Sequence, residues 1–449
     1  MTQIFVLNSA FGLMTAVAAL DSGAIPDAAG PRILLTVNAA AVPETSPSLD
    51  EMPHLEPLLR RFDRVESLAA IVAPTLPTQW EPAPEDLPML ERLLRRAWRI
   101  GDDPVALFLQ SPQVPPARTV AAVFPAAEIT VVGDGLMTYA PLRTTLPATT
   151  LARAVEVVYA DIVPGVAPLV LSERGIRRTA VPLSRFGDVL TDVAARIDDP
   201  ALDRLSRGGV PTALILGQYL ATLGLVSTAE ERAMQVDMID RALSWNLERV
   251  VFKPHPSAPP SLSEALIARA RERDLDVVVY DGDAPAEVVA ERIAAVGVVA
   301  GFSTALPTVH ALRGTPIAAV GTVELLARFS PYENSNRMPV TIVDALVHPP
   351  TSIPLADLVA AVGFTMQPRL MRHLEAGAVA TVGAMTADER ERWIGRRRLT
   401  ELGLPGGDTG VVARVRNAPV AVTRVEQARL VARGARRRLS RAWREVKGR

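Results

Sequence analysis

Three short segments of the sequence carry side chains that could do chemistry, and each follows an apolar run. An acid, Asp134, lies between two glycines, which leave its carboxylate open to a substrate. Lys253 and His255 lie two residues apart, with prolines on both sides of the histidine that stiffen the backbone. Ser303 and Thr304 precede a predicted helix, whose free N–H groups can bind an anion together with the two hydroxyls. The cationic side chains, hydroxyls and N–H groups of the last two segments are groups with which proteins bind phosphate.

Each segment also has an ordinary structural interpretation. Asp134 could cap its own backbone in a turn. The loop of Lys253 and His255 could simply face solvent, with the histidine capping a helix end or packed between its prolines. Ser303 and Thr304 could be helix N-caps, which is compatible with anion binding. Together, however, the segments favour group transfer from a phosphorylated donor. The two later segments would hold the phosphate, and Asp134 would take the proton of the acceptor.

Strand ends must position these segments, and the sequence supplies a repeated strand, loop and helix pattern. Apolar runs that end in polar or Gly/Pro loops lie at 4–7, 33–37, 68–72, 105–109 and 129–132. After a Gly/Pro break at 207–211, further runs lie at 213–216, 250–252, 277–280, 296–300 and 317–320. This alternation predicts parallel α/β sheets. We therefore expect two tandem Rossmann-like, doubly wound domains, with ligands at the carboxyl ends of the strands in the cleft between them.

The 449 residues are predicted to form three regions. Residues 1–205 form a Rossmann-like domain with the acid, 206–350 a second one with the phosphate loops, and 351–449 a helical, arginine-rich region. The net charge is −1, so no nucleic-acid partner is expected. The absence of cysteine excludes disulfides and thiolate zinc sites, and the five histidines lack the spacing of metal ligands.

We expect neither a signal peptide nor a membrane-spanning helix. No Lys or Arg precedes Arg32, and no apolar run reaches the ~20 residues that a spanning helix needs. From Arg424 to Arg449, ten Lys or Arg stand against Glu426 and Glu445. This stretch fits either a helix on an anionic membrane surface or a solvated terminal segment. The expected location is the cytoplasm, with peripheral contact at the inner face of the membrane as the alternative that the basic end offers.

The three chemical segments resemble, in the same order, motifs of the bacterial sialyltransferases and polysialyltransferases. Those families share an acidic Asp/Glu-Asp/Glu-Gly motif, a His-Pro motif and a paired Ser/Thr motif on a GT-B fold. The matches here lie at 134–135, 255–256 and 303–304, with further similarity to the polysialyltransferase-like group at 7–13 and 336–341. Gly133 stands where the family has its first acid, so Asp134 alone remains to act as the base. The resemblance covers roughly residues 1 to 350.

The resemblance implies an inverting glycosyltransferase. It would move a sialic acid or related nonulosonic acid, Kdn- or Kdo-like, from its CMP-activated donor to a glycan acceptor, and it could polymerise a capsule or cell-wall polysaccharide. Such a donor leaves as a nucleoside monophosphate, which Lys253, His255 and the helix start at Ser303 can stabilise without a metal or other cofactor. A protonated His255 could pass its proton to the leaving phosphate.

Further donor contacts are expected from Pro256, Thr304, Gln218 and Arg337. Gln218 follows a strand and could instead cap the next helix, whereas Arg337 could bind a carboxylate or phosphate in bidentate fashion or lie solvated in its loop. Two other functions stay open. One is a UDP- or GDP-sugar transferase or epimerase of the same fold, although the sequence shows no glycine-rich phosphate loop. The other is a non-catalytic nucleotide-sugar-binding protein, which would tolerate loss of Asp134.

Overall fold

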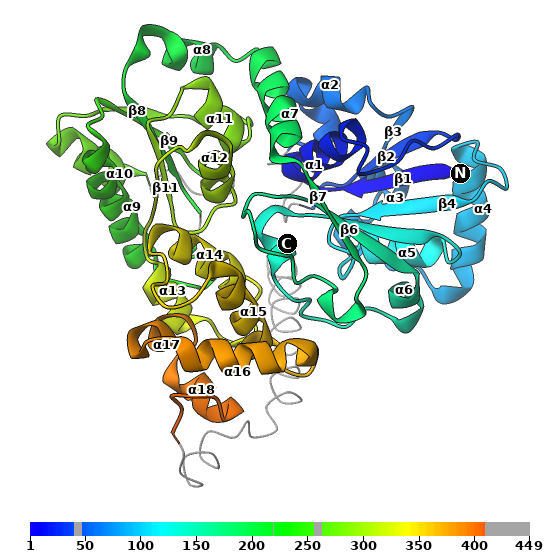
Figure 1. Ribbon diagram of the computed structural model, residues 1–449. Coiled ribbons are helices and arrows are strands. Elements are labelled where there is room, and N and C mark those ends of the chain that lie inside the picture. The colour runs from blue at the N-terminus through cyan, green and yellow to red at the C-terminus, as the bar shows by residue number, and fades with distance from the viewer. Residues whose placement is uncertain (40–46, 219, 256–262, 409–449) are drawn as a thin grey trace, which may run out of the picture. The chain divides into compact units, whose positions relative to one another are not determined.

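The computed structural model describes residues 1–39, 47–218, 220–255 and 263–408 (Figure 1). The chain divides into two compact units, Met1–Thr381 and Val382–Arg449. The first unit contains two sheets whose paired strands are all parallel, which confirms the predicted α/β architecture. The boundaries predicted at residues 205 and 350 stay predictions.

The first sheet has seven strands in the order β3-β2-β1-β4-β5-β6-β7. Their bounds are Thr2–Leu7 (β1), Arg32–Thr36 (β2), Arg64–Ser67 (β3), Val105–Leu109 (β4), Glu128–Val132 (β5), Ala154–Ala160 (β6) and Arg177–Val181 (β7). The chain runs outward from β1 to β3 on one side and from β4 to β7 on the other. The order therefore reverses between β1 and β4, and the crevice at their carboxyl ends is where sheets of this kind bind ligands.

The second sheet has five strands in the order β10-β9-β8-β11-β12. Their bounds are Thr212–Leu216 (β8), Arg249–Lys253 (β9), Asp276–Val279 (β10), Gly297–Ala300 (β11) and Ile317–Ala319 (β12). Here the order reverses between β8 and β11. The loops that follow β8, β9 and β11 thus leave three adjacent strands at the same edge of the sheet. With Lys253 at the end of β9, they carry the residues predicted to bind the donor apart from Arg337.

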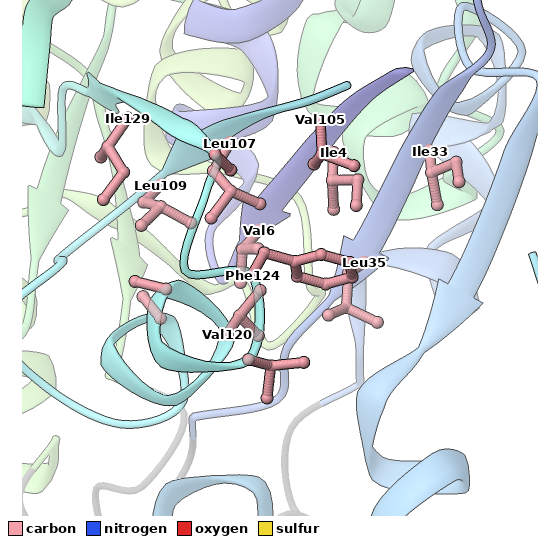
Figure 2. Packing of buried hydrophobic residues seen from close by; sticks show 14 of the residues in the cluster. Ile4, Val6, Ile33, Leu35, Val105, Leu107, Leu109, Val120, Phe124 and Ile129 are labelled. Carbon is pink, nitrogen blue, oxygen red and sulfur yellow. The ribbon is translucent and has the colours of Figure 1, made fainter. Parts of the chain in front are cut away.

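Helices connect the strands of both sheets (Figure 1). Those of the first sheet are α1 (Ala10–Asp21), α2 (Glu56–Leu59), α3 (Leu68–Val72), α4 (Leu87–Ala97), α5 (Ala117–Val123), α6 (Ala148–Arg153) and α7 (Leu183–Arg196), and α8 (Pro200–Ser206) precedes β8. The second sheet has α9 (Thr228–Ala242), α10 (Glu264–Glu272), α11 (Ala286–Arg292), α12 (Ala305–Arg313) and α13 (Thr322–Arg328). Figure 2 shows Phe124, which directly follows α5, packed against Val6 and Leu35 in the core below the first sheet.

Two predictions about the first sheet were wrong or incomplete. The run 68–72, predicted as a strand, is helix α3, and the strand is the preceding β3. A short apolar run fits a buried helix as well as a strand. Here Ser67 is the N-cap of the helix, and its hydroxyl accepts a hydrogen bond from the N–H of Ala70. Strands β6 and β7 were not predicted. The edge strand β7 is mostly exposed or half-buried, so its sequence carries no continuous apolar run.

The described part of the chain after the second sheet, up to residue 408, is helical, as predicted for the C-terminal region. It continues with α14 (Arg337–Val347), α15 (Leu355–Met366), α16 (Glu375–Ala384), α17 (Ala387–Trp393) and α18 (Arg396–Leu402). The basic stretch 424–449 lies outside the described residues. Within the portion of the chain that is described, no helix has the length and apolar character needed to cross a membrane.

Candidate active site

Asp134 lies in the loop directly after β5, at the carboxyl edge of the first sheet. Its Oδ1 accepts a hydrogen bond from Nε2 of Gln110 at 2.7 Å, and the hydroxyl of Ser111 lies 3.4 Å from Oδ2. Its own N–H donates to the hydroxyl of Thr138 at 2.6 Å. Gln110 and Ser111 thus contact the carboxylate of Asp134, while Thr138 binds the backbone N–H of the same residue.

Burial raises the pKa of Asp134 above its ordinary value. The hydrogen bonds from Gln110 and Ser111 act in the opposite direction, but desolvation is the larger effect. A carboxylate with a raised pKa is a better proton acceptor than one in water, where the pKa is about 3.9. The environment therefore suits the role of base that the sequence predicted for this residue.

Gln110 is a site residue that the sequence analysis missed. It follows β4 directly, just as the loop of Asp134 follows β5, and its side chain is 2% exposed. Besides Asp134, its amide binds the loop after β1, because Nε2 donates to the hydroxyl of Ser9 and Oε1 accepts from the N–H of Asn8. Its position directly after a buried strand could have marked it as a site residue. An uncharged amide, however, does not by itself indicate a catalytic or binding role.

The loop of Asp134 touches the loop of Ser303 and Thr304 directly. The N–H of Leu136 lies 3.3 Å from the hydroxyl oxygen of Thr304. Gly135 has a φ of +52°, and a Cβ there would lie 2.4 Å from Cγ2 of Thr304. A glycine is required because any side chain would strain the backbone and collide with Thr304. The structure therefore brings together two segments that lie 168 residues apart in the sequence.

Ser303 and Thr304 precede α12, as predicted, but their hydroxyls do different things. The Ser303 oxygen accepts from the N–H of Ala305 at 3.2 Å, which is a local turn at the helix start. Thr304 occupies the N-cap position without capping the helix, since its hydroxyl instead meets Leu136. Both side chains are half-buried.

Gln218, after β8, links two loops of the second sheet. Its Oε1 accepts from the N–H of Phe302 at 2.7 Å, so it supports the Ser303 loop rather than capping the next helix. Gly301 makes this approach possible, because a Cβ there would lie 2.4 Å from the same oxygen. Whether Gln218 also contacts a donor stays a prediction.

Lys253 is bound on the outer side of β9, toward β10. Its ammonium donates to the carbonyl of Gly282 at 2.6 Å and lies 4.9 Å from the ring centre of Tyr280. Burial lowers the pKa of Lys253 to about 8, although nearby carboxylates, first that of Asp283, act to raise it. The ammonium is still mostly protonated at neutral pH, but it would have to leave Gly282 to reach a phosphate.

His255 is exposed and lies two residues past the end of β9. Partial desolvation of its ring lowers the pKa below the ordinary value, while the carboxylate of Glu231 raises it and Lys253 lowers it further. The ring is therefore mostly neutral at pH 7 without a ligand, and a bound phosphate would have to restore its charge. Pro256, the other half of the predicted His-Pro motif, lies outside the described residues.

Arg337 was expected in a loop, and this was wrong. It is the first residue of α14, with a side chain that is 3% exposed. Its Nε donates to the backbone carbonyl of Tyr332 at 2.9 Å, and its guanidinium carbon lies 3.8 Å from the centre of the Tyr332 ring. These contacts make it a packed structural residue, and a contact to the donor stays a prediction.

No cluster of three or more His, Asp or Glu side chains that could hold a metal ion occurs among the residues that the structure describes. The expectation that the enzyme works without a metal or cofactor remains a prediction.

Comparison with solved structures gives distant matches. UDP-GlcNAc 2-epimerase from Methanocaldococcus jannaschii is 11% identical, with a TM-score of 0.41 and coverage of 78% of this chain and 100% of that one. The same enzyme from Rickettsia bellii is 10% identical (TM-score 0.40; 88% and 99% covered). A UDP-bound transferase from Siraitia grosvenorii is 12% identical (TM-score 0.38; 86% and 96% covered). Likeness this weak says nothing about the substrate.

Sequence comparison is more informative. A search of curated proteins found no match. The family model described as alpha-2,8-polysialyltransferase matches residues 3–322, which include both sheets and the segments of Asp134, His255 and Thr304. The chain therefore belongs to the alpha-2,8-polysialyltransferase family and is a glycosyltransferase with the GT-B arrangement of two Rossmann-like sheets.

Proposed function

We propose that the enzyme transfers a sialic acid or related nonulosonic acid from its CMP-activated donor to a glycan acceptor, with inversion at the anomeric carbon. Family membership supports a nucleotide-sugar donor and a glycan acceptor. The observation that carries the proposal is the contact of Leu136 with Thr304, which puts a buried carboxylate loop against a helix start suited to a phosphate.

The donor phosphate would bind at the edge of the second sheet. The loops of His255 and Ser303 leave β9 and β11 on either side of β8, so both can face one phosphate. The start of α12 offers N–H groups. Lys253, once it leaves the carbonyl of Gly282, and His255, once the phosphate has restored its proton, would add positive charge. A leaving nucleoside monophosphate carries one phosphate group, so these groups suffice to stabilise it, and we propose that no metal or other cofactor takes part.

In the proposed reaction, the acceptor oxygen forms a bond to the anomeric carbon while the bond from that carbon to the phosphate oxygen breaks. The electron pair of the broken bond goes to the phosphate, and CMP leaves. Asp134 takes the proton of the acceptor hydroxyl, which its raised pKa favours. One direct displacement gives inversion. The proposal extends to repeated addition, by which the enzyme would polymerise a capsule or cell-wall polysaccharide. The reaction would take place in the cytoplasm, with the basic C-terminal stretch in contact with the inner face of the membrane.

The test measures transfer from CMP-activated nonulosonic acids to glycan acceptors. Asp134→Asn keeps the shape of the side chain and should lower kcat about 10²- to 10⁴-fold. Asp103→Asn is the matched control, because Asp103 is exposed and precedes β4, at the opposite edge of the first sheet from the loop of Asp134. Full activity of Asp134→Asn would exclude it as the base.

Thermal unfolding with nucleotides tests the donor separately. CMP at 100 times its dissociation constant should add about 2.7 kcal/mol of stability. Stabilisation by UDP or GDP, with none by CMP, would overturn the donor assignment and favour a nucleoside diphosphate sugar.

A further inference from the structure

The amide of Gln110 makes contacts that fix its orientation. One N–H group donates to Oδ1 of Asp134 and the other to the hydroxyl of Ser9, each at 2.7 Å. The amide oxygen accepts from the N–H of Asn8 at 3.0 Å. If the amide were flipped, its oxygen would face the carboxylate and its N–H groups would face another N–H, so one orientation is strongly favoured.

The loop between β1 and α1 is built to hold this amide. Ser9 is the N-cap of α1 and also accepts from the N–H of Gly12. A Cβ on Gly12 would lie 2.5 Å from Oε1 of Gln110, so a larger residue would displace the amide. Asn8, Ser9 and Gly12 lie in the segment 7–13, which carries part of the family resemblance. They therefore surround the amide of Gln110 and keep it in place beside Asp134.

The two carboxylate oxygens of Asp134 are not equivalent. Gln110 binds Oδ1 closely, whereas Oδ2 has the longer contact of 3.4 Å to the hydroxyl of Ser111. Ser111 has a φ of +54°, which is uncommon outside glycine and turns the chain at this point. It lines a small hollow together with Gln110, Asn8, Val114 and Pro115, among others.

We infer that Gln110 is the positioning residue for the base: it holds Oδ1 of Asp134 so that Oδ2 lies beside Ser111, and the acceptor hydroxyl approaches Oδ2 from the hollow that Ser111 lines. The inference rests on the proposed function, because it needs Asp134 to accept the proton. Gln110 also lines this hollow, but its amide is bound to Asp134, Ser9 and Asn8, so it acts on the reaction through the base. Its removal should therefore change how the base titrates and how fast the reaction runs, but not how tightly the donor binds.

The main test is Gln110→Met, which keeps length and volume but removes the N–H donors. Loss of a hydrogen bond to a charged carboxylate should raise the pKa of Asp134 and move the acid limb of the kcat/KM profile up by about one pH unit. We also expect kcat on the plateau to fall about tenfold, with the KM for the CMP-activated donor unchanged within about twofold. Gln110→Asn, which keeps an amide that is too short to reach, should shift the limb in the same direction.

The matched control is Gln3→Met. Gln3 is 1% exposed in β1 and uses its amide to bind Pro26 and Arg32, away from Asp134. The control should leave the acid limb in place. CMP binding by each variant, measured by thermal shift, shows that it is folded. An unmoved acid limb in both folded Gln110 variants would overturn the inference.

The hollow is tested by Val114→Trp, since Val114 is 45% exposed on its rim. We expect the KM for the glycan acceptor to rise about tenfold or more, with the acid limb unchanged. An unchanged acceptor KM would remove the hollow from the acceptor path.

If Asp134→Asn is inactive while the Gln110 variants titrate normally, this inference fails and the proposed function stands. If Asp134→Asn keeps full activity, the assignment of Asp134 as the base fails, and the inference fails with it.

Discussion

Replacing Gly135 by alanine tests the contact between the two sheets' loops quantitatively. The backbone at Gly135 has a φ of +52°, where an L side chain costs about 1–2 kcal/mol. The new Cβ would also lie 2.4 Å from Cγ2 and 2.6 Å from Oγ1 of Thr304, closer than real Cβ contacts. Overpacking of this kind costs about 1–3 kcal/mol. The two effects together predict a loss of about 2–5 kcal/mol in the free energy of unfolding.

A double-mutant cycle separates the two effects. Thr304→Ala removes Cγ2 and Oγ1, the two atoms that the new Cβ would strike, and leaves Cβ at 3.1 Å from the built position. We expect Gly135→Ala in the Thr304→Ala background to cost about 1–2 kcal/mol, the backbone strain alone. The coupling energy should then be about 1–3 kcal/mol, well above the ~0.5 kcal/mol within which independent sites add. Urea unfolding monitored by tryptophan fluorescence measures each corner of the cycle.

Gly23 provides the control for backbone strain. Its φ is +73°, and a Cβ there would meet no atom within 4 Å, so Gly23→Ala carries strain without a collision. Equal losses for Gly135→Ala and Gly23→Ala, or additivity within the cycle, would refute the contact between Gly135 and Thr304. Transfer activity should follow stability only in part, because Gly135→Ala also displaces the neighbouring carboxylate.

Other substitutions test individual groups by their effect on stability. The pKa of Lys253 is about 8 in the folded chain against 10.5 ordinarily, so the unfolded chain binds more protons between these values and stability should rise with pH there, by roughly 1–3 kcal/mol. Lys253→Met should abolish that rise in urea unfolding between about pH 8 and 10, and an unchanged slope would contradict the burial of the ammonium. Arg337→Lys, which loses the stack on Tyr332, should cost about 2–4 kcal/mol in thermal unfolding; a solvated arginine would cost nearly nothing. Gly12→Ala should cost about 1–3 kcal/mol by striking Gln110, and wild-type stability with wild-type kcat would show that the loop gives way freely.

The strands that position the site were predictable because a buried parallel strand is a continuous apolar run. The run 105–109 coincides with β4, whose residues are all buried. The run 68–72 was wrongly predicted as a strand because it is too short for its periodicity to distinguish a helix from a strand. In the structure it is helix α3, and the hydroxyl of Ser67 caps it. The edge strand β7 is only partly buried and has no apolar run, whereas the edge strand β10 is equally exposed but keeps its valines and was predicted.

The chemistry of the site was predictable only as far as charged groups mark it. Asp134 stands out because it is an acid between glycines at a strand end. Gln110 has the same position relative to its strand, yet its importance comes from partners 24 and 101 residues away in the sequence. Arg337 misled for a different reason: Tyr332 lies only five residues before it, but the sequence does not show that the chain folds back so that the arginine stacks on that ring.

Thr304 shows why the proposed base and the proposed phosphate loop cannot be analysed separately. The sequence offered two roles for its hydroxyl, capping α12 or binding an anion, and the structure gives it a third, accepting from Leu136 in the loop of Asp134. A phosphate that binds at the start of α12 approaches the residue whose side chain also fixes the carboxylate loop. Substitution of Thr304 should therefore affect both donor binding and proton transfer, and its effects should not add to those of Asp134, because residues in one hydrogen-bonded network are coupled. Kinetic losses at Thr304 measure this coupled unit rather than a phosphate contact alone.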